Sequence, residues 1–255
     1  MVEFNEGAQE SLIDLFQLFN QRGVRYVVPR GHEELPEAVP GGDIDILIEN
    51  EDFETAVSCC RNAGFGRGWS VLDEIIHLSK VAISKPKKAL SLLKNSPREV
   101  FDLIQAVFTT KTSRSIGGEF REVKFQNDQI HIHLFDQLSH TSPMNQKSVR
   151  INPELVDKML ARRRSKDPIW VPHPVDELAH ILCRGIFDYG GDFPVYYVNL
   201  CKSLKSEVLL NEEDREKLRE VLELLFFHAT PVVMNAVEND DYNSIRDRLL
   251  TYDEY

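Results

Sequence analysis

Two aspartates separated by a single residue are the feature of this sequence most suited to chemistry. Asp43 and Asp45 lie in the segment Gly41–Ile48, where two glycines precede alternating aspartate and isoleucine residues. Side chains alternate between the faces of a strand, so both carboxylates should share one face while the isoleucines enter the core. Neighbouring carboxylates repel each other unless a cation lies between them, and Mg²⁺ bound with substrate phosphates is such a cation. The motif predicts a metal–nucleotide site, although a solvated strand edge would show the same pattern.

The elements that would position this pair are predicted by the spacing of apolar residues. A first helix ends at Gly23, and a strand follows over 24–28. The stretch 31–42 is rich in glycine, proline and acidic residues and is expected to be a loop that leads into the aspartate strand. A second helix should start after Asn50, a good N-cap residue, and stop at Gly64. This order of elements indicates an α/β unit.

The region between the second helix and residue 150 is less regular. Two apolar segments, 120–125 and 129–135, flank Gln126-Asn127-Asp128, and asparagine and aspartate at such a position favour a β-hairpin. One further strand and two helices are predicted upstream, over 75–83, 86–94 and 97–108. With the first elements they form an α/β domain over residues 1–150.

From Asn152 onward the pattern becomes helical. Helix starts are predicted at four capping or proline positions, namely Asn152, His173, Asn211 and Thr230. Gly190-Gly191 requires a turn between helices. We therefore expect an α+β chain, with a mixed sheet flanked by helices over 1–150 and an all-helical domain over 151–255.

The composition is that of a globular chain. Of 255 residues, 42% are apolar and 28% are charged, which argues against wholesale disorder. No apolar run approaches the length of a membrane span, and the N-terminus lacks a basic-then-apolar signal. The four cysteines show no metal-type spacing. Reduced thiols in a cytoplasmic protein are the expectation.

The charge is unevenly distributed along the chain. A net charge of −11 makes broad nucleic-acid binding an unlikely function, because phosphate backbones require a basic surface. Residues 80–124 differ, since they contain ten lysines or arginines and only four acidic residues. This basic island could steer an anionic substrate, and a solvated basic face is the equally simple alternative.

The motif and the order of elements together resemble the nucleotidyltransferase superfamily, whose fold is that of the catalytic domain of DNA polymerase β. Gly42-Asp43-Ile44-Asp45-Ile46 matches the second half of the family signature. The chain is most similar to uncharacterised nucleotidyltransferase-like proteins often associated with surface-polysaccharide genes. Two further segments carry this likeness, Arg30–Pro36 and Gln129–Phe135. The resemblance covers about the first 140 residues and implies a nucleotidyltransferase-like mixed sheet followed by helices.

The chain departs from the family pattern in two places. The usual Gly-Ser pair after the first strand is missing, and Arg30 stands there, where its guanidinium could hold phosphate beside Gly41 and Gly42. A structural ion pair of Arg30 is the equally weighted alternative. A third carboxylate completes the metal site in active members, and the strand alignment puts His133 at its position. His131 shares that face, and Asp136 would face the other way. Imidazole suits Mn²⁺ or Zn²⁺ better than Mg²⁺. Altered metal preference, weak activity, nucleotide binding without turnover, and simple packing of the two histidines all remain open.

The resemblance implies a metal-dependent enzyme that transfers a nucleoside monophosphate from a nucleoside triphosphate to a hydroxyl group. Asp43 and Asp45 would hold Mg²⁺ or Mn²⁺, His133 would act as base or extra ligand, and Arg30 with lysines of the basic island would hold phosphates. The acceptor would be a small molecule such as a sugar or polyol phosphate, a glycan precursor, or a protein. A nucleotide-binding or assembly subunit with weakened catalysis is the alternative. A glycosyltransferase is disfavoured because its Asp-x-Asp normally comes later in the chain.

Three other groups are assigned no chemistry. Asp176 and His180, four residues apart on the predicted helix after Pro174, are interpreted as surface support. Trp69 and Trp170 are expected to pack rather than to stack a base. The acidic tail from Glu238 to the end is expected to be solvated, with a docking segment as the alternative.

Overall fold

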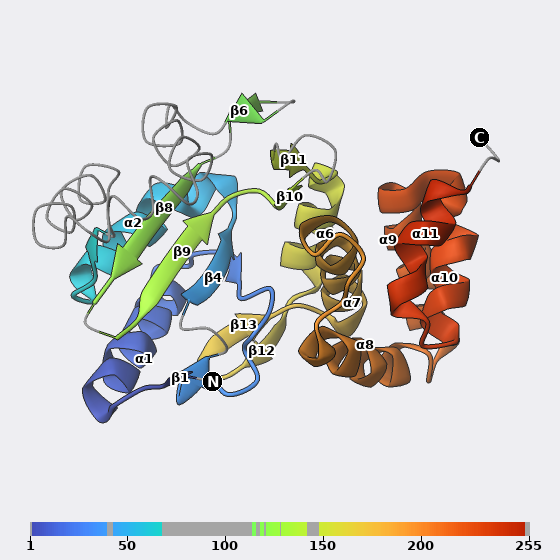
Figure 1. Cartoon of the computed structure of the whole chain (residues 1–255). Helices are drawn as coiled ribbons and strands as arrows, with labels where there is room; N and C mark the ends of the chain where they lie inside the picture. Colours follow the sequence, from blue (N-terminus) through green and yellow to red (C-terminus); the bar gives the residue numbers. More distant parts are fainter. Residues whose placement is uncertain are drawn as a thin grey trace, which may run out of the picture.

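The computed structural model combines a mixed β-sheet with a group of C-terminal helices (Figure 1). It describes residues 2–39, 43–67, 114–115, 118–119, 121–127, 129–141 and 148–252. The strand predicted over 75–83, the helices predicted over 86–94 and 97–108, and most of the basic island lie outside the described residues. The chain is therefore of the mixed α+β class within its described part.

The central sheet has five strands in the order β2-β4-β9-β8-β5. These strands are β2 (Tyr26–Val27), β4 (Asp43–Ile48), β9 (His131–Phe135), β8 (Glu122–Gln126) and β5 (Gly66–Arg67). The β4 and β9 strands run parallel, and every other pairing in the sheet is antiparallel. The aspartate strand thus lies next to the histidine strand, with its aspartates opposite the histidines.

Two helices cover one face of this sheet, α1 (Glu6–Gln21) and α2 (Phe53–Asn62). A short 3₁₀ turn, η1 (Asn50–Asp52), precedes α2. The isoleucines of β4 are buried against these helices in one apolar cluster, as the alternation predicted. The aspartates share the other face of β4 with Leu47, which belongs to a second apolar cluster built mainly from C-terminal helices. The carboxylate face therefore points toward the helical part of the chain.

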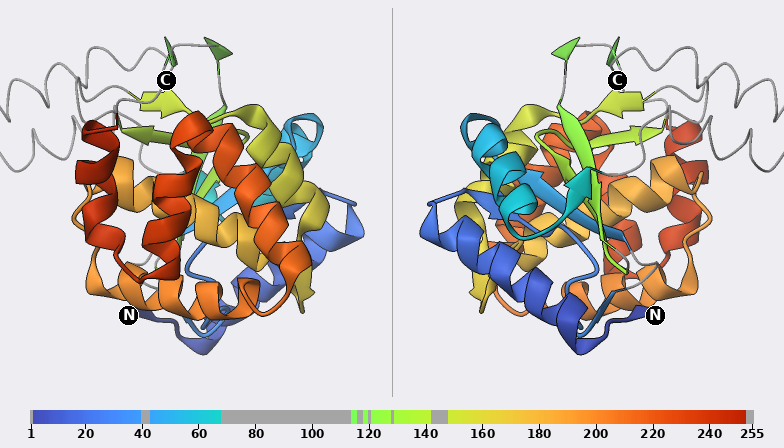
Figure 2. Two further views of the ribbon diagram at one scale, coloured as in Figure 1. Left: turned by 90° about the vertical axis from the view of Figure 1, so that its right-hand side faces the viewer. Right: turned by 90° about the vertical axis from the view of Figure 1, so that its left-hand side faces the viewer.

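The C-terminal part is mainly helical, and the left view of Figure 2 looks onto these helices with the sheet behind them. Its α-helices are α6 (Pro153–Arg162), α7 (Pro174–Cys183), α8 (Val195–Val208), α9 (Glu212–Phe226), α10 (Thr230–Glu238) and α11 (Ile245–Leu250). A π-helical turn, η2 (Arg184–Asp188), continues directly from α7. Two 3₁₀ turns, η3 (Phe227–Ala229) and η4 (Tyr242–Ser244), separate the last helices.

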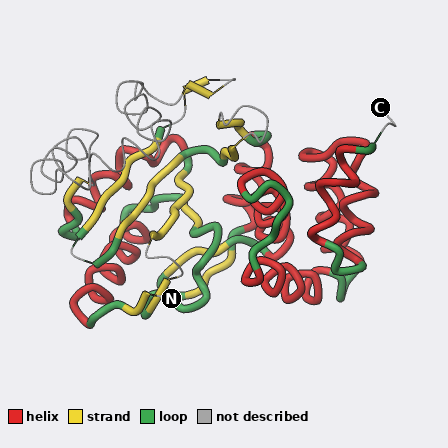
Figure 3. The backbone as a smooth tube through the Cα atoms, viewed as in Figure 1, coloured by secondary structure: helices red, strands yellow, loops and turns green. Residues whose placement is uncertain are grey.

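One segment of this region departs from the all-helical prediction. β12 (Arg164–Lys166) and β13 (Ile169–Val171) form an antiparallel hairpin, visible among the yellow strands in Figure 3. The backbone N–H of Val28 donates to the carbonyl of Trp170 at 2.9 Å, so the hairpin continues the sheet at the β2 edge. Ile169 and Val171 are buried in the apolar cluster of the N-terminal half. The division near residue 150 stays a prediction, but packing crosses it.

Three small two-stranded sheets complete the described structure. β1 (Val2–Glu3) pairs with β3 (Ala38–Val39), inside the stretch predicted to be a loop. β10 (Ser139–Thr141) pairs with β11 (Ser148–Arg150), and β6 (Arg114–Ser115) pairs with β7 (Gly118–Glu119).

Most of the predicted helix boundaries are confirmed. The side chains of Asn152, His173 and Asn211 each accept a hydrogen bond from a backbone N–H in the first turn of α6, α7 and α9. The cap predicted at Asn50 is wrong, because its side-chain oxygen accepts instead from the guanidinium of Arg121. An arginine more than seventy residues away in sequence competes for that oxygen, and local spacing does not reveal it.

One helical stretch, Glu212–Glu238, is long and apolar enough to cross a membrane by length and composition alone. Half of its apolar window is buried inside the protein. Phe227, with φ at 51°, breaks the stretch into α9 and α10, which pack against each other. Core helices pass the same test, so this stretch is weak evidence for a membrane span.

Candidate functional site

The two aspartates differ in their surroundings. In the β4–β9 ladder, Asp43 lies opposite His131 and Asp45 lies opposite His133. The Asp43 side chain is 72% exposed, and its Oδ1 is 3.9 Å from Nδ1 of His131. The Asp45 side chain is only 14% exposed. Asp45 is therefore the interior carboxylate of the pair, while Asp43 stands at the open end of the strand.

Two cationic or protonatable groups contact Asp45. Nη2 of Arg30 donates to its Oδ2 in an ion pair, and Nδ1 of His133 lies 3.3 Å from its Oδ1. Burial by itself would raise the pKa of Asp45, but the hydrogen bond from His133 and the charge of Arg30 outweigh it and lower the pKa. The carboxylate is ionised, and both of its oxygens are engaged.

His133 joins two acidic residues from the strands on either side of it. Its Nε2 is 3.5 Å from Oε2 of Glu122 on β8. Burial disfavours the charged ring, yet the hydrogen bonds and charges of Asp45 and Glu122 together raise the pKa of His133. An acid thus does lie beside the position predicted for the third carboxylate. The hairpin was predicted but its register was not: in the structure Lys124 pairs with His133, and Glu122 lies two residues before Lys124 on the same strand.

The donors of this site fit a divalent cation only after a rearrangement. Carboxylates and imidazole are suitable ligands for Mn²⁺ and, for the carboxylates, Mg²⁺. Among the residues that the structure describes, however, no group of three or more Cys, His, Asp or Glu side chains is arranged to hold a metal. Asp45 is moreover ion-paired with the guanidinium of Arg30, so a cation at this carboxylate would have to displace that group.

Residues from the C-terminal helices surround the same carboxylate. The hydroxyl of Tyr197 on α8 accepts from Nη1 of Arg30 at 3.4 Å and from Nε of Arg184 at 3.2 Å. Arg184 is the first residue of η2, and its Nη1 is 3.4 Å from Oδ2 of Asp188 in the same turn. No sequence pattern marks Tyr197 or Arg184 as functional residues, because only the tertiary fold brings them near the aspartate strand.

A cleft of about 100 Å³ opens beside Asp45. Its walls come from β4, β8, β9 and β10 on the sheet side and from α7 and η2 on the helical side. Its lining residues are Asp45, Glu122, His133, Phe135, Gln137, Leu138, Ser139, His180 and Arg184. The cleft therefore combines acidic, basic and neutral polar groups with two apolar side chains, Phe135 and Leu138.

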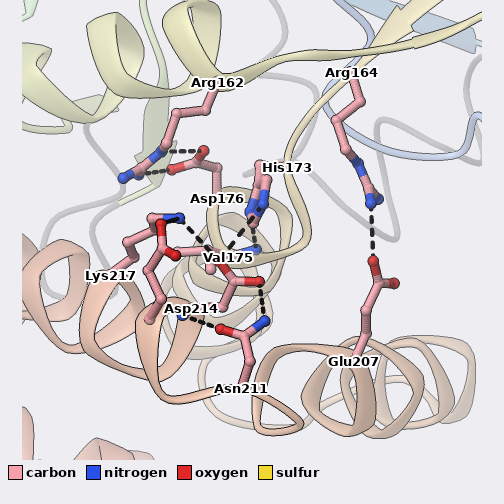
Figure 4. A network of polar contacts seen from close by, with 10 residues as sticks. Arg162, Arg164, His173, Val175, Asp176, Glu207, Asn211, Asp214 and Lys217 are labelled. Carbon is pink, nitrogen blue, oxygen red and sulfur yellow. Dashed lines mark hydrogen bonds and ion pairs between the residues drawn. The ribbon is translucent and has the colours of Figure 1, made fainter.

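The surface role predicted for Asp176 and His180 is wrong, because both side chains are buried. Asp176 accepts from the guanidinium of Arg162, with Nε to Oδ2 at 3.0 Å, inside the network that joins α6, α7 and α9 (Figure 4). His180 lines the cleft instead. The interpretation assumed that this helix exposes a polar face, whereas every residue of α7 is buried.

The remaining predicted residues are placed as follows. Asp136 follows the end of β9 and is buried, and its carboxylate accepts from the backbone N–H of Arg121 at 2.9 Å and from its Nε at 3.1 Å. Asp136 takes no part in the cleft. Trp170 packs under the guanidinium of Arg163. Gly41, Gly42 and Trp69 lie outside the described residues, so their predicted roles stay predictions.

The comparisons with known proteins place the chain in no family. It matches no protein-family model, and no curated protein matches it in sequence. The assignment of a function therefore depends on the geometry around Asp45.

Proposed function

We propose that this protein is a metal-dependent nucleotidyltransferase with a nucleotidyltransferase-like fold. It would bind a nucleoside triphosphate with Mg²⁺ or Mn²⁺ and transfer the nucleoside monophosphate to a hydroxyl group. The observation that carries the proposal is the register of two parallel strands, which sets Asp43 and Asp45 opposite His131 and His133 on one face beside a cleft. The metal would neutralise charge on the triphosphate and on the departing pyrophosphate.

The protein groups divide into three roles. Asp43 and Asp45 would hold the cation, and Arg30, once it leaves Asp45, would hold phosphate oxygens through its planar fork of donors. His133 would accept the proton of the attacking hydroxyl, with Glu122 stabilising the resulting imidazolium at Nε2. The four cysteines are buried and unbridged, which supports a cytoplasmic location for this chemistry.

One observation favours a second candidate, a protein that binds a nucleotide without turning it over. The ion pair with Arg30 and the contact with His133 engage both oxygens of Asp45. If Arg30 stays in place when the nucleotide binds, a metal cannot reach that carboxylate. The same cleft would then serve as a nucleotide-binding or assembly element.

Titration calorimetry with ATP, CTP, GTP and UTP, each with Mg²⁺ and then with Mn²⁺, tests the proposed site. We expect metal-dependent binding of at least one nucleotide, and its loss in the double variant Asp43→Asn, Asp45→Asn. The matched control is Asp14→Asn, Asp157→Asn, which removes the same charge at two exposed helical positions. Absence of binding with either metal would overturn the site, as would equal binding by the two double variants.

Release of pyrophosphate separates the two candidates. Transfer requires pyrophosphate release from the bound nucleotide when a sugar phosphate, a polyol phosphate or a protein acceptor is added. Metal-dependent binding without release in all three cases supports the second candidate.

Arg30→Gln gives a further test. It should tighten binding of Mn²⁺ alone, because the cation no longer competes with a guanidinium. It should also weaken binding of the metal–nucleotide by about tenfold, the equivalent of one hydrogen bond to a charged group. Weaker binding of Mn²⁺ alone would contradict the competition.

A further inference from the structure

The residues that line the cleft beside Asp45 fall into two chemical sets. Asp45, Glu122 and His133 were assigned above to the cation and to proton transfer. Arg184, His180 and the hydroxyl-bearing Ser139 line the same cleft. This second set carries a fixed cation and neutral polar groups, and the proposed transfer chemistry does not use it.

The position of Arg184 is fixed by its local structure. It is the first residue of η2, and the N–H of Tyr189 donates to its carbonyl at 3.1 Å across the π turn. Single π turns inside helices are frequent at functional sites. Nε of Arg184 donates to the hydroxyl of Tyr197, and Nη1 is paired with Asp188. Nη2 has no hydrogen bond or ion pair within the described part of the chain, so one corner of the guanidinium stays available to a ligand in the cleft.

Asp188 ties this turn to the opposite wall of the cleft. Its Oδ1 accepts from the backbone N–H of Thr141 at 2.8 Å, and its Oδ2 lies 2.9 Å from Nδ1 of His140. Thr141 and His140 belong to β10, which also contributes Ser139 to the cleft. The guanidinium of Arg184 and the hydroxyl of Ser139 are therefore held in relation to each other before any ligand binds.

His180 supplies a polar group without a partner. Its residue is 3% exposed, and its Nδ1 has no hydrogen-bond partner among the described residues. Its ring lies 5.6 Å from the ring of His140, centroid to centroid. Buried polar atoms are normally hydrogen-bonded, and His180 is one of the residues that line the cleft. We therefore infer that a group bound in the cleft completes the hydrogen bonding of this ring.

We propose that Arg184, His180 and Ser139 form a binding subsite for a phosphate group within the cleft. An arginine with a free donor, a neutral histidine and a serine hydroxyl provide the donors that phosphate oxygens require. A cleft of about 100 Å³ has room for one such group. Two sources share this chemistry, the triphosphate tail of the nucleotide and a phosphate on the acceptor. The assignment of the phosphate to the nucleotide or to the acceptor rests on the proposed function, whereas the binding of inorganic phosphate itself does not.

Calorimetry with inorganic phosphate, in the absence of metal and nucleotide, tests the subsite directly. We expect the full chain to bind phosphate and Arg184→Gln to bind it at least about tenfold more weakly, the loss of one hydrogen bond to a charged group. The matched control is Arg164→Gln, which makes the same charge change in an exposed ion pair with Glu207 (Figure 4). Equal phosphate binding by these two variants would overturn the subsite, as would no binding by the unaltered chain.

Two further variants keep the test decisive. If Arg184→Gln fails to fold, Ser139→Ala should still weaken phosphate binding, and Arg184→Lys should retain part of it because the charge remains. Unchanged binding in Ser139→Ala would count against the subsite.

The double variant Asp43→Asn, Asp45→Asn should bind phosphate at least as well as the unaltered chain, since it removes negative charge nearby. Phosphate binding can thus persist where metal-dependent nucleotide binding fails, and the reverse result is equally visible.

Competition identifies the source of the phosphate. If the triphosphate tail fills the subsite, ATP with Mn²⁺ should displace inorganic phosphate, and Arg184→Gln should weaken ATP binding. If the acceptor fills it, glycerol 3-phosphate should compete with inorganic phosphate while ATP and Mn²⁺ remain bound. Displacement by neither compound would remove the subsite from the proposed reaction.

Discussion

Asp45 has partners in the structure and is also one of the ligands of the proposed metal. A carboxylate that is 14% exposed cannot stay charged without partners, and Arg30 and His133 supply them. The ion pair with Arg30 occupies Asp45 in the structure. Binding of the proposed metal at Asp45 would therefore be an exchange in which one cation replaces another, and a triphosphate that attracts Arg30 would favour that exchange. This predicts that metal and nucleotide bind together more tightly than either does alone.

The buried ring of His180 should give the protein a specific pH dependence. Burial, with help from the nearby His140 and Arg184, holds the pKa of His180 well below its usual value. The unfolded chain binds a proton at His180 near pH 6.5, whereas the folded chain does not. The free energy of unfolding therefore decreases as the pH falls below about 6.5. Between about pH 7.5 and 5.5, His180→Gln should reduce this loss by about 1 kcal/mol. Urea unfolding of both proteins at each pH measures the effect, and parallel losses would show that His180 titrates normally.

At the scale of elements, the turn η2 connects the helical part to the sheet. Arg184 at its start reaches Tyr197 and the cleft, and Asp188 at its end reaches β10. Gly185 allows this turn to lie close to the residues after it. An added Cβ at that position would come within 2.1 Å of Cζ of Phe193, a buried ring. The turn therefore depends on a position without a side chain.

Gly185→Ala should destabilise the fold by about 1–3 kcal/mol, because the ring of Phe193 must shift within a packed core. The control is Gly7→Ala in α1, where the nearest atom to the added Cβ is 3.8 Å away and the substitution should be neutral or slightly stabilising. The double variant Gly185→Ala, Phe193→Leu should unfold at a higher denaturant concentration than the sum of the two single effects predicts. If the destabilisations of the two single variants simply add in the double variant, the ring of Phe193 is not the cause of the destabilisation by Gly185→Ala.

The elements also show how far sequence reasoning can go. The alternation in Gly41–Ile48 predicted the buried isoleucines and the shared carboxylate face, because a strand has a fixed period of two. The predicted hairpin and strand alignment brought His133 to Asp45. Tyr197 and Arg184 could not be predicted from local patterns, since Tyr197 contacts Arg30 across 167 residues of sequence and Arg184 reaches the same hydroxyl from η2. The helix cap predicted at Asn50 is wrong for the same reason. The distant Arg121 donates a hydrogen bond to the side-chain oxygen that local rules assign to the cap.

At the scale of the whole molecule, two apolar clusters are linked across the predicted domain boundary. Val27 and Leu47 of the sheet belong to the cluster of the C-terminal helices, and Ile169 and Val171 belong to the cluster of the N-terminal half. Each half thus contributes residues to the core of the other. We expect the described parts of the two halves to unfold as one cooperative unit.

Two matched substitutions test this cooperativity. Ile169 and Ile245 are both almost fully buried, one in each cluster. Ile169→Ala and Ile245→Ala should each lower the free energy of unfolding by about 2–4 kcal/mol. Each should shift the transitions seen by tryptophan fluorescence and by far-UV circular dichroism by the same amount. A variant in which one signal changes well before the other would indicate two independent units.

The hairpin at the edge of the sheet has a consequence for synthesis of the chain. The N–H of Val28 is satisfied by the carbonyl of Trp170, and an uncovered edge strand is a template for pairing with other chains. The ribosome makes Val28 long before it makes Trp170, and at 5–20 residues per second the interval is on the order of ten seconds. During that interval the nascent chain has an unpaired strand edge. Whether it avoids pairing with other chains depends on how soon the hairpin is synthesised and folds, or on a chaperone that covers the strand.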